Sequence, residues 1–176
     1  MGSGKLTTPL LGFCAYASGT GKTTLLISLI PLLNEAGLRI SVIKHTHHPV
    51  DIDQPGKDSY RLRKSGAVQM LLSSNERLAL MTERTRAEKD TEPDLQELLR
   101  QMDTSLADLI VVEGFKHAPI PKIEIYRPSL GTPLLAEHDA HIIAIAADGE
   151  VKTKLPVLDL NNPVNICAFV QTWLKG

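Results

Sequence analysis

Leu10 to Thr24 reads LLGFCAYASGTGKTT, and no other stretch of the chain says as much about its architecture. Leu10 to Ala15 is nearly all apolar, which predicts a strand buried on both faces. A glycine-rich turn follows, and Lys22 to Ala36 has the apolar periodicity of an amphipathic helix, with Gly37 at its end. A strand, a glycine-rich loop and a helix in this order predict a phosphate-binding loop.

This loop has a physical mechanism for binding a nucleoside triphosphate. Its backbone N–H groups surround the β-phosphate, and the positive end of the following helix points to the same place. Lys22 supplies a positive charge to the β- and γ-oxygens, and the Thr23 hydroxyl supplies a ligand to Mg²⁺. The alternative is a chance glycine-rich turn before a helix. The predicted phosphate-binding residues are Ser18, Gly19, Thr20, Gly21, Lys22, Thr23 and Thr24.

The loop departs from the strict Walker A pattern at one position. Tyr16 stands where the pattern has its first glycine, so the turn out of the strand must suit a bulky residue. We therefore expect Gly19 to supply the backbone freedom that the turn needs.

An acidic residue, Glu113, follows the apolar segment Leu109 to Val112 and is itself followed by Gly114. P-loop proteins place a carboxylate at a strand end near the loop, where it holds Mg²⁺ and can orient the attacking water. We predict this role for Glu113, with Lys22 as the other catalytic residue. The alternative is a buried strand that simply meets solvent at Glu113.

The segment from Lys44 to Asp58 begins where a second predicted strand, Leu38 to Ile43, ends. Ligands of α/β sheets gather at the carboxyl ends of strands, so Lys44 and His45 are predicted to contact nucleotide. Asp51 and Asp53 are predicted metal ligands. A transition-metal site made by His45, His47, His48 and an aspartate, or a solvated polar loop, are the alternatives.

Strands alternate with helices along the chain, which predicts an α/β fold of the P-loop NTPase type. We expect a mostly parallel twisted sheet flanked by helices, with additional antiparallel strands, in one domain over residues 1–176. Residues 1–8 are expected to be disordered or left over from cloning. Further strands are predicted at 68–72, 78–81, 122–126, 141–147 and 156–158, and helices at 58–66, at 93–102 and after Asn162.

Lys122 to Tyr126 alternates polar and apolar residues, which predicts a half-exposed strand. Lys122, Glu124 and Tyr126 would then face outward. An uncovered edge strand risks aggregation unless it pairs, so this strand is expected at a twofold dimer interface.

Composition excludes several partners. A net charge of -1 and 4% aromatic residues do not predict nucleic-acid binding. The sequence lacks a run of about 18 apolar residues, so no membrane span is expected. Cys14 and Cys167 lie in apolar surroundings, which favours reduced core thiols and a cytoplasmic protein.

Four motifs occur in a fixed order and resemble one family. They are SGTGKTT at 18–24, IKHTHH at 43–48, PGKDS at 55–59 and VEGFK at 112–116. The chain is similar, from Leu10 to the C-terminus, to the molybdopterin-guanine dinucleotide biosynthesis adapter proteins of the MobB family.

This resemblance implies that the chain binds GTP with Mg²⁺, hydrolyses it slowly and forms a homodimer. It further implies that the protein assists the guanylyltransferase MobA, which joins GMP to molybdopterin, and that molybdopterin itself is a possible ligand. The usual guanine signature is absent; Asp148, which follows a predicted strand, is the candidate for contacting guanine, and a surface turn is the alternative.

Two other functions remain open at this point. A small-molecule kinase or ATP-dependent ligase would need lid arginines, for which Arg84 and Arg86 are the clustered candidates. A metallochaperone would use the histidine segment. Since no arginine is expected in or beside the phosphate loop, we predict slow hydrolysis that depends on a partner.

Overall fold

The computed structural model describes residues 8–46, 50–84 and 93–176. It divides the chain into two compact units, which we describe separately. The first comprises Met1–His45 with Leu98–Gly176, and the second Thr46–Glu97. The expectation of a single domain stays a prediction. Thr8, expected in a disordered start, is buried, and its hydroxyl donates a hydrogen bond to the Thr104 carbonyl (2.9 Å).

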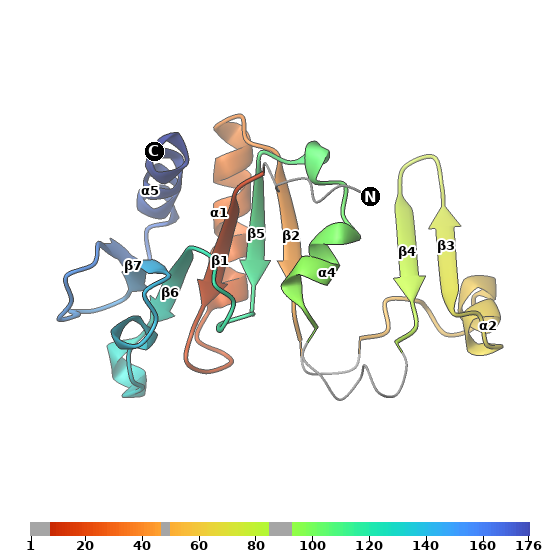
Figure 1. Cartoon of the computed structure of the whole chain (residues 1–176), viewed down its shortest axis with the longest axis horizontal. Coiled ribbons are helices and arrows are strands. Elements are labelled where there is room, and N and C mark those ends of the chain that lie inside the picture. The colour runs from red at the N-terminus through yellow and green to blue at the C-terminus, as the bar shows by residue number, and fades with distance from the viewer. Residues whose placement is uncertain (1–7, 47–49, 85–92) are drawn as a thin grey trace. The chain divides into compact units, whose positions relative to one another are not determined.

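The first unit is built on a six-stranded sheet in which every pair of neighbours is parallel (Figure 1). This confirms the predicted parallel α/β fold. Because β1 lies inside the sheet, the loop that follows it opens at the carboxyl edge between neighbouring strands. In spatial order the strands are β2 (Ile40–Lys44), β5 (Leu109–Glu113), β1 (Leu10–Cys14), β6 (Lys122–Tyr126), β7 (Ile142–Ala147) and β8 (Val157–Asp159).

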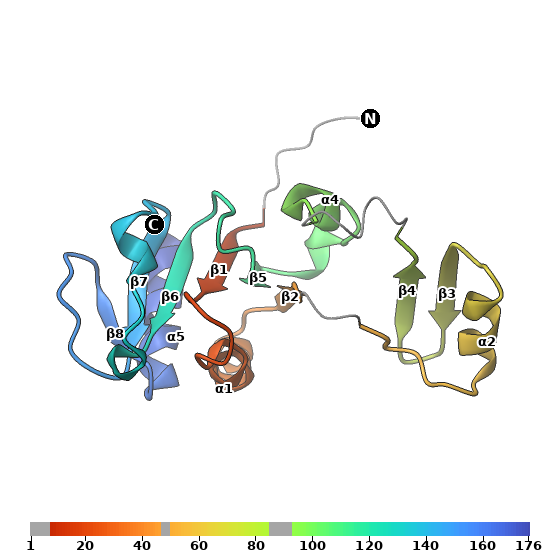
Figure 2. The ribbon, with the colours of Figure 1, turned by 90° about the horizontal axis from the view of Figure 1, so that it is seen from below.

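Helices α1 (Lys22–Glu35) and α5 (Pro163–Lys175) pack on one face of this sheet (Figure 2). The buried leucines of α1 and the inward residues of α5 meet alternate residues of the central strands, such as Leu11 and Phe13 of β1. The helix boundaries follow the predicted capping signals. Gly37 has a φ of 87° just after α1, and the Asn162 side chain accepts a hydrogen bond from Asn165 N at the start of α5.

The prediction that Lys122 to Tyr126 forms a half-exposed edge strand is wrong. β6 lies between β1 and β7, and Lys122 and Glu124 are only 1% and 0% exposed. Both charges have partners: Lys122 Nζ pairs with Asp139 Oδ2 (2.8 Å), and Glu124 accepts hydrogen bonds from the backbone N–H groups of residues 135 and 136. The alternation therefore marks buried, compensated charges. The edges of the sheet are β2 and β8.

The second unit contains α2 (Asp58–Lys64) and an antiparallel hairpin of β3 (Gln69–Ser73) and β4 (Leu78–Thr82). The hairpin confirms the additional antiparallel strands. α2 begins at Asp58, as predicted, and Lys57 takes the N-cap position.

The remaining elements are short. α4 (Leu95–Arg100) begins in the second unit and ends in the first, and three 3₁₀ turns lie at Thr104–Leu106, Pro128–Leu130 and Leu135–Glu137. Among the residues described, no helix has the length and apolar character needed to cross a membrane.

Candidate functional site

The loop between β1 and α1 has the backbone that the sequence predicts. Gly19 and Gly21 have φ values of 78° and 110°, a region that favours glycine. Tyr16 is not among the positive-φ residues and is 50% exposed, so a bulky side chain fits where the Walker A pattern has glycine. The turn therefore takes its conformational freedom from Gly19 and Gly21.

Hydrogen bonds within the loop fix its shape. The Thr20 hydroxyl donates to the Ala17 carbonyl (2.8 Å), and Thr20 is 4% exposed. Lys22 Nζ donates to the same carbonyl (3.3 Å), which holds the ammonium over the loop. Among the described residues, no acidic side chain stands in the first turn of α1 and none caps its N-terminus. The N–H groups at this helix end are therefore available to an anion.

Thr23, Glu113 and Lys44 meet beside the loop. The Thr23 hydroxyl donates to Glu113 Oε1 (2.6 Å), and Lys44 Nζ lies 2.9 Å from Thr23 Oγ1 and 3.0 Å from each Glu113 carboxylate oxygen. Parallel pairing of β2 with β5 sets Lys44 opposite Glu113, and pairing of β1 with β5 sets Glu113 beside the P-loop strand. Three segments that are far apart in the sequence thus place polar side chains within hydrogen-bond distance of one another.

The backbone after Glu113 is shaped by the close approach of His45. His45 N donates to Glu113 O (2.9 Å), and a Cβ on Gly114 would lie 3.1 Å from His45 Cβ. Gly114 has a φ of 101°, and Phe115 (φ 50°) is the one non-glycine residue with positive φ in the described part of the chain. The His45 ring packs on Phe115 with centroids 5.1 Å apart. His45 therefore supports the turn that follows the acidic strand.

The expectation of no arginine beside the phosphate loop is wrong. Arg127 Nε donates to the Thr20 carbonyl (2.9 Å), and its guanidinium also pairs with Asp148. A Cβ on Gly21 would lie 3.2 Å from Arg127 Nη2. Arg127 directly follows β6 and Asp148 directly follows β7, so both lie at the carboxyl edge of the sheet. The sequence signal that could have pointed to both residues is that each directly follows a predicted strand.

Asp51 and Asp53 lie in the second unit, where both pair with Arg63. The Arg63 side chain, which is 9% exposed, also pairs with Glu83 (2.8 Å), and the Ser59 hydroxyl donates to Asp53 Oδ1 (2.8 Å). The PGKDS motif therefore contributes to an ionic cluster within this unit, and the role of these aspartates as metal ligands stays a prediction.

Parts of the predicted site lie outside the described residues, namely His47, His48 and Arg86. Within the described ranges, no group of three or more histidine, cysteine, aspartate or glutamate side chains is arranged to hold a metal ion. The cysteines are free and buried, and burial, with a smaller contribution from Glu124, raises the pKa of Cys14 to about 12. Cys14 is thus a protonated core thiol.

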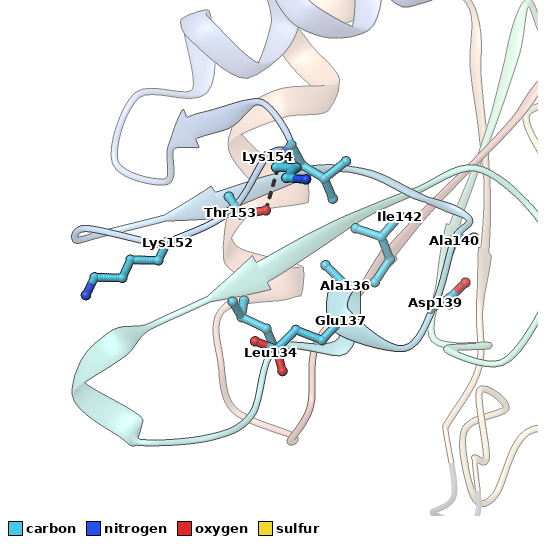
Figure 3. Close-up of a pocket in the computed structure, with 10 residues that line it drawn as sticks. Leu134, Ala136, Glu137, Asp139, Ala140, Ile142, Lys152, Thr153 and Lys154 are labelled. Atoms are coloured by element: carbon cyan, nitrogen blue, oxygen red, sulfur yellow. Dashed lines mark hydrogen bonds between the residues drawn. The ribbon is translucent and has the colours of Figure 1, made fainter.

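A pocket of about 320 Å³ lies elsewhere, near the start of β7 and before β8 (Figure 3). Ile142 and Leu134 line it together with residues 152–155, and none of the predicted site residues is among its lining residues. In Figure 3 the Lys152 side chain extends away from the other labelled residues. We therefore place the candidate site at the loop before α1.

Fold and loop together define a protein of the P-loop class. The family model of molybdopterin guanine dinucleotide synthesis protein B, MobB, matches residues 10–148. The chain belongs to the MobB family.

Relatives with assigned names agree with this. The molybdopterin-guanine dinucleotide biosynthesis adapter protein of Escherichia coli is 49% identical, over 98% of this chain and 97% of its own length. The Haemophilus influenzae protein of the same name is 43% identical, over 94% and 89%. A crystal structure of molybdopterin-guanine biosynthesis protein B superposes with a TM-score of 0.73 at 27% identity, covering 95% of this chain and 99% of the other. The chain therefore has an adapter role in molybdopterin guanine dinucleotide biosynthesis.

Proposed function

We propose that the protein binds GTP with Mg²⁺, hydrolyses it weakly and assists MobA in guanylyl transfer to molybdopterin. The observation that carries this proposal is the meeting of Thr23, Glu113 and Lys44 beside the P-loop. A phosphate cradle and a hydroxyl–carboxylate pair within one unit are the parts that a nucleotide–Mg²⁺ complex requires. The pathway is inferred from the relatives, which are molybdopterin-guanine dinucleotide biosynthesis adapter proteins.

The donor set fits Mg²⁺. Thr23 Oγ1 and Glu113 Oε1 are hard oxygen ligands 2.6 Å apart, and they already face one cationic group, the Lys44 ammonium. Thr23 and Glu113 would hold the ion, which would offset the negative charge of the phosphates. Ser18 to Thr24 would hold the phosphates through backbone N–H groups, with Lys22 as the fixed positive charge.

For the base, we propose that Asp148 accepts hydrogen bonds from guanine. Its pairing with Arg127 supports this role, because the guanidinium links Asp148 to the Thr20 carbonyl of the phosphate loop. One side chain would then fix the distance between the base contact and the phosphate contact.

Slow hydrolysis and an adapter role go together. P-loop GTPases gain orders of magnitude in rate when a group positions the water or offsets developing charge. Arg127 lies at the loop, but its guanidinium is engaged by Asp148 and Thr20. We therefore expect the protein alone to be a poor enzyme in the cytoplasm, and its effect to emerge with MobA and molybdopterin.

We further propose a homodimer whose subunits meet through the hairpin β3–β4. Leu71 and Leu80 are opposite each other in this hairpin and are 59% and 47% exposed. An isolated two-stranded hairpin is marginally stable, and exposed apolar side chains mark contact surfaces. A second copy of the chain would cover them.

Thermal unfolding with GTP, ATP and Mg²⁺ tests the nucleotide proposal. A ligand whose free concentration is 100 times its Kd stabilises the folded state by about 2.7 kcal/mol. We expect GTP with Mg²⁺ to raise the melting temperature more than ATP does. An equal or larger shift with ATP, together with rapid phosphorylation of a small molecule, would favour the kinase alternative.

A further inference from the structure

The Lys44 ammonium takes the position between Thr23 and Glu113 that a divalent cation would occupy. We propose that Lys44 is a built-in counter-ion, which fills the Mg²⁺ position of the nucleotide-free protein and leaves it when Mg²⁺ arrives with the nucleotide. This inference rests on the proposed nucleotide function. It assigns Lys44 a positioning role at the cation site, beyond a contact to phosphate.

The Lys44 ammonium occupies the space between Thr23 and Glu113 and uses all of its hydrogen-bond donors there. Lys44 Nζ is bound to three oxygens at 2.9, 3.0 and 3.0 Å, from the Thr23 hydroxyl and both carboxylate oxygens of Glu113. Mg²⁺ binds oxygen at about 2.1 Å and would use the same atoms. An ammonium and a magnesium ion cannot share these ligands, because both charge and volume oppose it. Binding of one therefore requires departure of the other.

Burial shows which partner moves. The Glu113 side chain is 9% exposed and belongs to a strand with neighbours on both sides, whereas the Lys44 side chain is 49% exposed at the end of edge strand β2. A buried carboxylate without a partner is costly, while a lysine ammonium on its flexible stem is easily hydrated. Glu113 thus stays in place, and Lys44 can leave once another cation neutralises the carboxylate.

This arrangement changes how nucleotide binding depends on Mg²⁺. In the wild type without Mg²⁺, Lys44 neutralises Glu113, so an incoming diphosphate does not meet a bare carboxylate. In Lys44→Met the carboxylate is bare until Mg²⁺ binds. Removal of Mg²⁺ should therefore weaken nucleotide binding more in Lys44→Met than in the wild type.

The experiment is a fluorescence titration with N-methylanthraniloyl-GDP, in excess Mg²⁺ and in excess EDTA. GDP is chosen because it lacks the γ-phosphate, so a Lys44 contact to that group would not affect the result. The readout is the Kd in EDTA divided by the Kd in Mg²⁺. We expect this ratio to be about tenfold larger in Lys44→Met than in the wild type.

Three controls make the result specific. Lys44→Arg keeps a cation and should have a ratio close to the wild type. Adding Lys44→Met to Glu113→Gln should leave the ratio of the single Glu113→Gln variant unchanged, because no carboxylate remains to be neutralised. Arg39→Met removes the ion pair with Asp108 at the opposite ends of the same strands and should also leave the ratio unchanged.

The outcomes separate the two claims. If the wild type does not bind the GDP probe in Mg²⁺, the proposed nucleotide function fails. If the wild type binds and folded Lys44→Met has the wild-type ratio, Lys44 is a permanent ion pair of Glu113 and the counter-ion inference is overturned.

Discussion

Lys22 is the residue whose loss should affect phosphate binding most and the fold least. Its side chain is partly exposed, and its hydrogen bond in the structure goes to the Ala17 carbonyl at 3.3 Å. Lys22→Ala removes a charge-assisted contact to phosphate worth about 1.5–3 kcal/mol, so GTP affinity should fall about tenfold to a hundredfold. Titration with labelled GTP measures this, and the melting temperature without ligand should not change. Unchanged GTP affinity would refute the role of the loop.

Arg127 is expected to link the base and phosphate sites. Arg127→Ala removes the hydrogen bond to Thr20 O and leaves Asp148 without this partner. We expect GTP affinity to fall about tenfold, a loss comparable to one charge-assisted hydrogen bond. The same titration measures it, with Arg127→Lys as the matched variant, which keeps the charge but cannot reach both partners as a fork. Wild-type affinity in Arg127→Ala would show that the linkage is only structural.

Single residues of the site differ in how far the sequence could predict them. Thr23 and Glu113 belong to motifs with a known mechanism, and the structure brings their side chains to 2.6 Å. Arg127 carries no local motif; it reaches the loop only because β6 lies next to β1. Which strands are neighbours depends on the strand order of the sheet, and the spacing of apolar residues in the sequence does not predict that order.

Among the elements, the starts of β2 and β5 are joined by an ion pair that should affect acid stability. Hydrogen bonds from the Arg39 side chain and backbone to Asp108 lower its pKa from 3.8 to about 2. Below pH 4 the folded protein therefore binds fewer protons here than the unfolded chain does. The stabilisation is complete above pH 4 and is lost as the pH falls toward about 2.

Asp108→Asn tests this directly. The free energy of unfolding, measured by urea titration between pH 4.5 and 2, should decline less steeply in the variant than in the wild type. Parallel declines would mean that the pair does not contribute to the pH dependence.

The same scale explains what the sequence predicted well and what it did not. Most strand ends lie within two residues of their predicted positions, because apolar runs and glycine or proline signals bound each element. The bounds of β6 were predicted correctly, but its exposure and its place in the sheet were not. Alternation of polar and apolar residues does not distinguish a half-exposed strand from a buried strand whose charges have partners. Buried Lys122 and Glu124 are compensated by Asp139 and by backbone groups of residues 135 and 136, contacts that only the folded chain creates.

For the whole molecule, the hairpin of the second unit carries exposed apolar side chains on both of its strands, namely Leu71, Leu72, Leu78 and Leu80. Leu80→Lys in β4 should shift a homodimer toward monomer, because a charge at a contact surface must be desolvated. Light scattering at micromolar concentration measures the mass. Val164→Lys, at an exposed position of α5 in the first unit, is the matched control and should remain dimeric. A wild type that is already monomeric would refute the dimer.

We propose that this chain acts through a bound nucleotide in molybdopterin guanine dinucleotide formation. The most direct measurement is the yield of that product made by MobA at limiting GTP, with and without this protein. We predict that the wild type raises the yield and that Lys22→Ala, folded but impaired in phosphate binding, does not. An equal yield in all three reactions, or an equal increase with both proteins, would show that the chain does not act through a bound nucleotide.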